Sequence, residues 1–155
     1  LTCATDAQQL REGVFLTGEI PRRTAFEGPM PGAKIIKDGE DMDDPLMDEQ
    51  ALVVNLGEKG LVIISGCSHP GIVNTIQYAQ EITGNSRIYA VIGGLHLAQV
   101  GDEVLTQTIN GIKDCGAQLA LTGHCTGFRP HTRMSQELGS TFAISCVGSI
   151  ATLAA

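Results

Sequence analysis

The feature that most constrains the fold is the alternation of short apolar runs with amphipathic segments from residue 51 onward. Residues 51–56 and 61–65 are apolar, β-branched runs separated by the glycine-bounded stretch 57–60, which is typical of a β-hairpin. Later apolar runs at 88–92 and 119–122 each follow a segment of helical periodicity. The pattern predicts an α/β fold in which crossover helices make successive strands parallel.

Helix boundaries follow from local signals. A first helix is expected to contain Pro70 in its first turn, where a missing N–H is tolerated, and to end at Gly84. Asp102 or Gly101 is a suitable cap for a second helix. A short helix at 132–138 and a last strand at 141–146 complete the expected order.

The N-terminal third differs in amino-acid composition from the rest of the chain. Residues 1–50 carry four of the six prolines and the whole of an acidic run at 40–49, and we expect a lid-like or irregular segment with short strands at 14–20 and 33–37. Residues 51–155 are expected to form the α/β unit. The sequence therefore predicts two regions.

Charge and cysteine usage exclude several classes of protein. A net charge of −7 argues against nucleic acid and anionic membranes as partners. No apolar run reaches the roughly 18–20 residues that cross a bilayer. The five cysteines are odd in number and form no CxxC pair, so we expect a reduced, cytoplasmic protein.

Three of the four histidines follow a predicted strand within a few residues. His69 comes after 61–65, His96 after 88–92 and His124 after 119–122. Because the carboxyl ends of parallel strands share one edge of a sheet, and ligands bind there, we expect these imidazoles to converge. Imidazole is a common ligand of zinc and also suits other transition metals. A metal site at this edge is therefore predicted, with capped core histidines as the alternative.

Neighbouring polar residues have two interpretations each. Cys67 and Cys125 could bind metal directly or serve as small packing residues. Ser68 and Thr126 could orient the imidazoles by hydrogen bonds or cap the following turns. His131 precedes the last expected helix and is predicted to be a solvated surface residue.

Several motifs together resemble a known family. They are GCSHPGIVN at 66–74, GGLHL at 93–97, HCTG at 124–127, IPRRTAFE at 20–27 and DEQAL at 48–52. They resemble the branch of the metallo-β-lactamase superfamily that contains dihydropterin-6-methyl-ribofuranosylaminobenzene-phosphate synthases and many hydrolases. The similarity covers nearly the whole chain.

The resemblance implies a four-layer αββα sandwich with a metal site at one edge, and metal-dependent hydrolysis or a pterin-type synthesis. It implies that His69 and His124 are metal ligands and that His96 is a ligand or faces the substrate. Cys67 stands roughly where many relatives have a bridging aspartate. The superfamily's HxHxDH segment is absent, and the chain begins with Leu1. We therefore expect the C-terminal half of the sandwich, inactive when isolated.

The resemblance further implies a divalent transition metal, with zinc first and iron or manganese as alternatives, and a small-molecule substrate. Arg22 and Arg23 could clamp a phosphate or carboxylate. The expected partner is the missing N-terminal half or a second copy of the chain, because half a sandwich exposes an apolar sheet face. The alternative function is a non-catalytic, self-associating half-domain with at most weak metal binding. A doubly wound nucleotide-binding domain is a further alternative, but GxGxxG and GxxxxGK[ST] are both absent.

Overall fold

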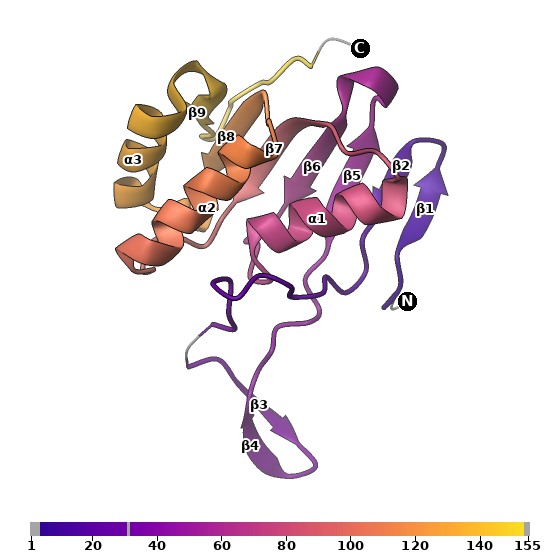
Figure 1. Ribbon diagram of the computed structural model, residues 1–155. Helices are drawn as coiled ribbons and strands as arrows, with labels where there is room; N and C mark the ends of the chain where they lie inside the picture. The colour runs from indigo at the N-terminus through magenta and orange to yellow at the C-terminus, as the bar shows by residue number, and fades with distance from the viewer. Residues whose placement is uncertain (1–3, 31, 154–155) are drawn as a thin grey trace.

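The computed structural model describes residues 4–30 and 32–153. Its centre is a seven-stranded sheet with the order β1-β2-β5-β6-β7-β8-β9, and β3 and β4 form a separate hairpin that projects from it (Figure 1). The strands are β1 (Gln8–Arg11), β2 (Val14–Leu16), β3 (Lys34–Lys37), β4 (Glu40–Asp43), β5 (Ala51–Asn55), β6 (Leu61–Ser65), β7 (Ile88–Gly94), β8 (Leu119–Gly123) and β9 (Phe142–Ile144). The helices are α1 (Ile72–Thr83), α2 (Asp102–Asp114) and α3 (Phe128–Leu138), with short 3-10 turns at Gly57–Lys59, His124–Thr126 and Gly139–Thr141.

The strand pairing confirms the predicted α/β fold. β5 and β6 form the expected antiparallel hairpin, in which Ala51 pairs with Ser65 and Asn55 with Leu61. β6, β7, β8 and β9 then run parallel to one another. The carboxyl ends of β6, β7 and β8 consequently lie at the same edge of the sheet, and the loops that carry the histidines leave from that edge.

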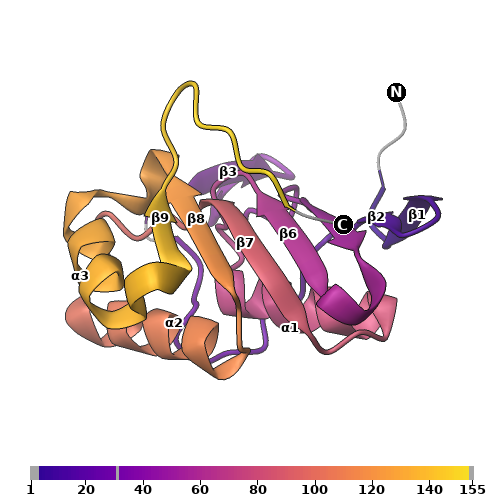
Figure 2. The same cartoon turned by 90° about the horizontal axis from the view of Figure 1, so that it is seen from above.

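The three α-helices pack on one face of the sheet (Figure 2). Alternate residues of the central strands, such as Ile63 and Val91, are fully buried on this face and contact helix residues that include Ile76 and Leu105. Burial of each such aliphatic side chain stabilises the fold by about 1.5–3 kcal/mol. This core fixes the strand ends in relation to one another. None of the helices in the described ranges is long and apolar enough to cross a membrane.

The other face of the sheet is also apolar. Leu52, Ile64, Ile92 and Leu121 are register partners across β5 to β8 and form one transverse row. Ile64 is 38% exposed, whereas its neighbour Ile63 on the helical face is 0% exposed. The three α-helices all lie on the opposite side (Figure 2), so this row faces away from them.

Several boundaries differ from the sequence-based expectation. α1 begins at Ile72, after Pro70, and α3 begins at Phe128, directly after Gly127 and before the expected residue 132. β1 and β2 extend the main sheet, and Ile20 joins the core, so part of residues 1–50 belongs to the α/β unit. The reason is long-range pairing of β2 with β5, which local composition does not reveal.

Candidate metal centre

The loops after β6 and β7 bring two imidazoles into contact. The ring centroids of His69 and His96 lie 4.5 Å apart at an interplanar angle of 63°. One possible ligand atom from each ring and the sulfur of Cys67 all lie within 4.8 Å of one another. These three donors are close enough for a single transition-metal ion to be shared after small side-chain adjustments, given bonds of about 2.0–2.3 Å.

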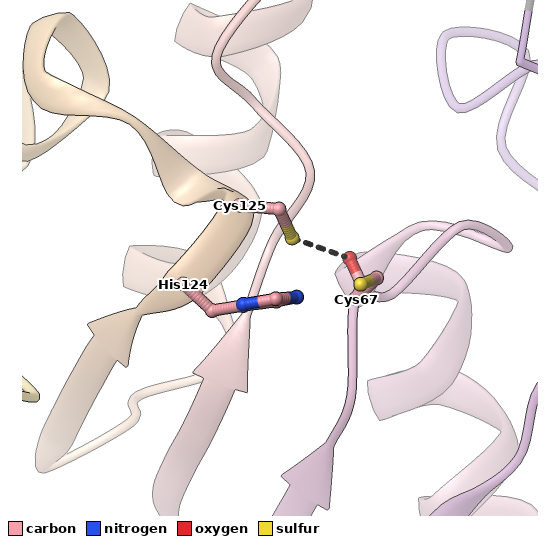
Figure 3. A group of neighbouring side chains, drawn as sticks. All are labelled: Cys67, His124 and Cys125. Atoms are coloured by element: carbon pink, nitrogen blue, oxygen red, sulfur yellow. Dashed lines mark hydrogen bonds between the residues drawn. The ribbon is translucent and has the colours of Figure 1, made fainter. Parts of the chain in front are cut away.

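The loop after β8 brings a second group of donors to the same edge. His124, Cys125 and Cys67 also have ligand atoms within 4.8 Å of one another. His124 and Cys125 come from the end of β8 and approach Cys67 from across the edge (Figure 3). The three predicted histidines therefore share one edge but divide into two groups, and Cys67 belongs to both.

The backbone at this edge adopts an unusual conformation. Ser68, His96 and His124 have φ values of 59°, 48° and 51°, in the left-handed region that is uncommon for residues other than glycine. Each residue in this conformation lowers the stability of the fold by on the order of 1 kcal/mol or more, so the conformation persists only where surrounding contacts hold it. All three occur in the histidine loops, which is typical of a functional site.

Polar side chains hold the loops in place. Buried Ser68 donates from its Oγ to the Gly94 carbonyl at 2.9 Å and lies 2.7 Å from the Ser65 hydroxyl. Thr126, which is fully buried, accepts a hydrogen bond from the backbone N–H of Leu95 at 3.1 Å. The positions predicted to orient the imidazoles thus join the ends of β6, β7 and β8.

Glu49 organises the loop that carries His69. One carboxylate oxygen accepts the backbone N–H groups of Cys67 at 2.8 Å and Ser68 at 2.5 Å. The other oxygen accepts the backbone N–H of His69 at 2.6 Å and lies 2.8 Å from its ring Nδ1. A carboxylate that accepts from the Nδ1–H of a ligating histidine fixes its tautomer and leaves Nε2 for the metal.

Glu49 had no predicted role. A signal was nevertheless present in the predicted hairpin, because the pairing of Ala51 with Ser65, continued two residues outward, places Glu49 beside Cys67. Glu49 is the last residue of an acidic run, so its sequence context did not distinguish it from solvent-exposed carboxylates.

A second buried carboxylate caps the helix that follows. Glu27 accepts the backbone N–H groups of Val73 and Asn74, both at 2.8 Å, at the start of α1. A side chain at Gly71 would collide with Glu27, since an added Cβ would lie 2.2 Å from its carboxyl carbon. Burial raises the pKa of Glu27, and the two backbone hydrogen bonds partly offset this shift. The contact holds the segment before β3 against the site.

The two arginines suggested as substrate clamps occupy different places. Arg22 donates from Nη2 to the His69 carbonyl at 3.0 Å and from Nη1 to the Pro45 carbonyl at 2.7 Å, so it supports the loop. Arg23 forms an ion pair with Glu81 on α1 at 2.5 Å. Neither arginine is among the residues that line the cavity described below.

Electrostatics at the site favour neutral donors in the absence of metal. Burial, together with the neighbouring Cys125 thiol and the Glu49 carboxylate, raises the pKa of Cys67 to about 11. Burial and the nearby His69 lower the pKa of His96. The Nδ1 of His96 is buried and has no hydrogen-bond partner among the described residues. A neutral imidazole with a buried, unpartnered nitrogen beside a thiol and a second imidazole is a donor set that fits a transition metal.

A cavity of about 800 Å³ opens beside the two imidazoles. Its walls combine apolar side chains with a few polar groups, including Phe26, Glu27, His69, Ile72, Leu95, His96 and Val104. A mostly apolar cavity of this size with convergent polar groups is typical of a small-molecule site.

His131 lies apart from this edge. It belongs to α3, where its ring centroid is 5.9 Å from that of Phe142, and it is half-buried. The expectation of a solvated surface residue was therefore wrong, because α3 begins earlier than predicted and turns this side chain toward β9. Burial lowers the pKa of His131.

The fold matches that of a solved structure. A metal-dependent hydrolase of the β-lactamase superfamily superimposes with a TM-score of 0.83 and 29% sequence identity, over 92% of this chain and 54% of that one. The chain belongs to the metallo-β-lactamase superfamily. The predicted family and its α/β fold are thereby confirmed.

Curated relatives of this superfamily member come from Methanocaldococcus jannaschii. A 7,8-dihydropterin-6-methyl-4-(β-D-ribofuranosyl)-aminobenzene-5′-phosphate synthase is 38% identical over 148 residues, which are 94% of this chain and 50% of the relative. An uncharacterised protein is 32% identical over 142 residues, again 50% of its length. No protein-family model matches the sequence. The chain spans about half the length of the relatives it matches.

Proposed function

We propose that the protein is a metal-dependent hydrolase that acts on a small molecule, with this chain contributing part of the metal site. The observation that carries the proposal is the meeting of Cys67, His69 and His96 within 4.8 Å, beside a cavity of about 800 Å³. A divalent transition metal bound at such a site supplies Lewis acidity to the reaction. The solved relative is itself described as a metal-dependent hydrolase.

The chain's own residues have distinct roles in this proposal. Glu49 holds His69 through Nδ1, so Nε2 is the nitrogen that would bind the ion. His96 would bind through a ring nitrogen kept neutral by burial. His124 belongs to the second group of donors, with Cys67 and Cys125, and would bind metal from the end of β8. Mixed sulfur and imidazole donors suit zinc first, with iron and manganese as alternatives.

The cavity supports a small-molecule substrate but leaves its class open. Its apolar walls would bury most of a molecule of drug size, and His69 and His96 lie at its border. One relative's name describes a pterin phosphate synthase. A pterin-type synthesis is therefore the finer alternative to hydrolysis.

We further propose that a partner covers the apolar row of Leu52, Ile64, Ile92 and Leu121. The chain spans about half of its relatives' length, so the remaining half is the proposed occupant. The other candidate occupant is a second copy of the chain. Coverage of the row by a second copy is what the alternative function, a non-catalytic, self-associating half-domain, requires. Free Cys67, Cys115, Cys125 and Cys146 support the proposal of a reducing, cytoplasmic location.

The experiment compares the chain alone with the protein extended to its relatives' length. We expect the extended protein to bind a transition metal and to hydrolyse members of a panel of phosphate esters and lactones. His69→Ala should remove most of the activity and lower the metal content, whereas the matched variant His131→Ala should keep both. Absence of bound metal in the extended protein would refute the hydrolase. Self-association of the chain alone, with an inactive extended protein, would support the non-catalytic alternative.

A further inference from the structure

The three donors at the end of β8 form a group with a different chemistry from the imidazole pair. Cys67 and Cys125 provide two sulfurs and His124 one imidazole, with ligand atoms all within 4.8 Å of one another (Figure 3). In a tetrahedral zinc site, bonds of about 2.0–2.3 Å place neighbouring ligand atoms about 3.3–3.8 Å apart. Small rotations of the side chains therefore suffice to enclose an ion.

One backbone group donates a hydrogen bond to the sulfur of Cys125. The sulfur accepts the backbone N–H of His96 at 3.2 Å, and without a bound ion the Cys125 thiol donates its own proton to the Cys67 carbonyl at 3.6 Å. Backbone donors to cysteine sulfur are a recurring way to stabilise and tune metal-bound thiolates.

The absence of a side chain at Gly94 leaves room for Cys125 and His124. A Cβ added at Gly94 would lie 2.7 Å from the Cys125 sulfur and 3.3 Å from Cδ2 of His124. Gly94 at the end of β7 therefore lets both donors approach the strand end closely, which any larger residue would prevent.

We propose that Cys67, Cys125 and His124 hold a thiophilic divalent ion of the zinc class, at a position beside the His69–His96 pair. The inference deepens the proposed function, on which it rests, by assigning two sulfur ligands at the same edge. Binding replaces the two thiol protons, which pass to solvent, so two thiolates balance the charge of the ion. Two thiolates and one imidazole leave the fourth tetrahedral position free for water or substrate, as in catalytic zinc sites of this ligand composition.

The shared residue links the two positions. Cys67 belongs to both groups of donors, so its sulfur lies between the imidazole pair on one side and the second sulfur with His124 on the other. Cys125 also lines the cavity, which places the thiolate group at the border of the substrate space.

Cobalt(II) titration of the 155-residue chain under a non-thiol reductant tests the sulfur ligands. A sulfur-to-cobalt charge-transfer band in the near ultraviolet arises only when thiolate binds the ion. We expect the band in the native chain, reduced to about half by Cys67→Ser or Cys125→Ser and unchanged by the control Cys115→Ser, since each thiolate contributes separately. Cobalt binding without this band, or equal loss in the Cys115 variant, would overturn the proposal.

Alkylation of the native chain gives a second test that needs no variant. With zinc at about 100 times its dissociation constant, mass action predicts that alkylation of Cys67 and Cys125 slows by about 100-fold. Exposed Cys146 is the internal control and should react at the same rate with and without zinc. Equal rates at Cys67 with and without zinc would overturn the inference.

The two proposals fail in different ways. If the extended protein hydrolyses substrate with bound metal but shows no sulfur band, only the thiolate inference fails. If the band and the protection appear but the extended protein is inactive, the proposed function fails and the thiolate site stands.

Discussion

Replacement of Glu49 by glutamine would remove the acceptor that joins the histidine loop to the start of β5. In the native chain its two carboxylate oxygens accept three backbone N–H groups and the Nδ1–H of His69. Glutamine keeps one acceptor oxygen and places an amide NH₂ against the remaining donors. Two of the four contacts are therefore lost, whichever way the amide is oriented.

The size of the effect follows from burial and charge. Hydrogen bonds to a charged group contribute about 1.5–3 kcal/mol each, and a buried donor left without a partner has a similar cost. The side chains of Glu49 and His69 are 14% and 21% exposed, so solvent screening is modest. Because the contacts share one carboxylate and are not additive, we expect Glu49→Gln to lower the free energy of unfolding by about 3 kcal/mol.

Urea denaturation measures this change, and Asp48→Asn is the matched control. Asp48 is adjacent and exposed, so its substitution removes the same charge and should alter the free energy of unfolding by less than about 0.5 kcal/mol. Nitrogen NMR of His69 should also show loss of the single Nδ1–H tautomer in the glutamine variant. A change below about 1 kcal/mol in Glu49→Gln, or one equal to that of the control, would refute the assigned role.

Three further outcomes are expected. Gly94→Ala should destabilise the fold by about 1–3 kcal/mol and weaken the sulfur-to-cobalt band, because its Cβ would lie 2.7 Å from the Cys125 sulfur; Gly28→Ala, with no atom within 4 Å, is the control in both assays. The lowered pKa of His131 means that the unfolded chain binds its proton more tightly, so stability should be complete above about pH 6.5 and fall as the pH decreases toward the folded pKa. The urea midpoint should therefore depend less on pH in His131→Leu than in the native chain. An equal dependence on pH in the two proteins would contradict the assignment. Ile64→Asp should weaken association through the apolar row, which sedimentation velocity detects, and unaltered association would place the interface elsewhere.

Local sequence patterns determined the elements and the edge on which the site lies. The hairpin at 51–65 and the parallel order of β6, β7 and β8 follow from β-branched runs, glycine turns and intervening helical periodicity. Because parallel strands share a carboxyl edge, the positions of His69, His96 and His124 in the sequence already implied their common edge. These features depend on short-range chemistry, which composition and spacing express directly.

Tertiary structure alone decided how the donors are grouped and supported. The division into an imidazole pair and a thiolate group depends on side-chain directions set by left-handed residues in three separate loops. The function of Glu49 arises from a contact across the hairpin, and the burial of His131 from packing of α3 against β9. Such contacts join residues far apart in the chain, so no local pattern of propensity encodes them. The same holds for the apolar row, whose members become neighbours only when the strands pair in register.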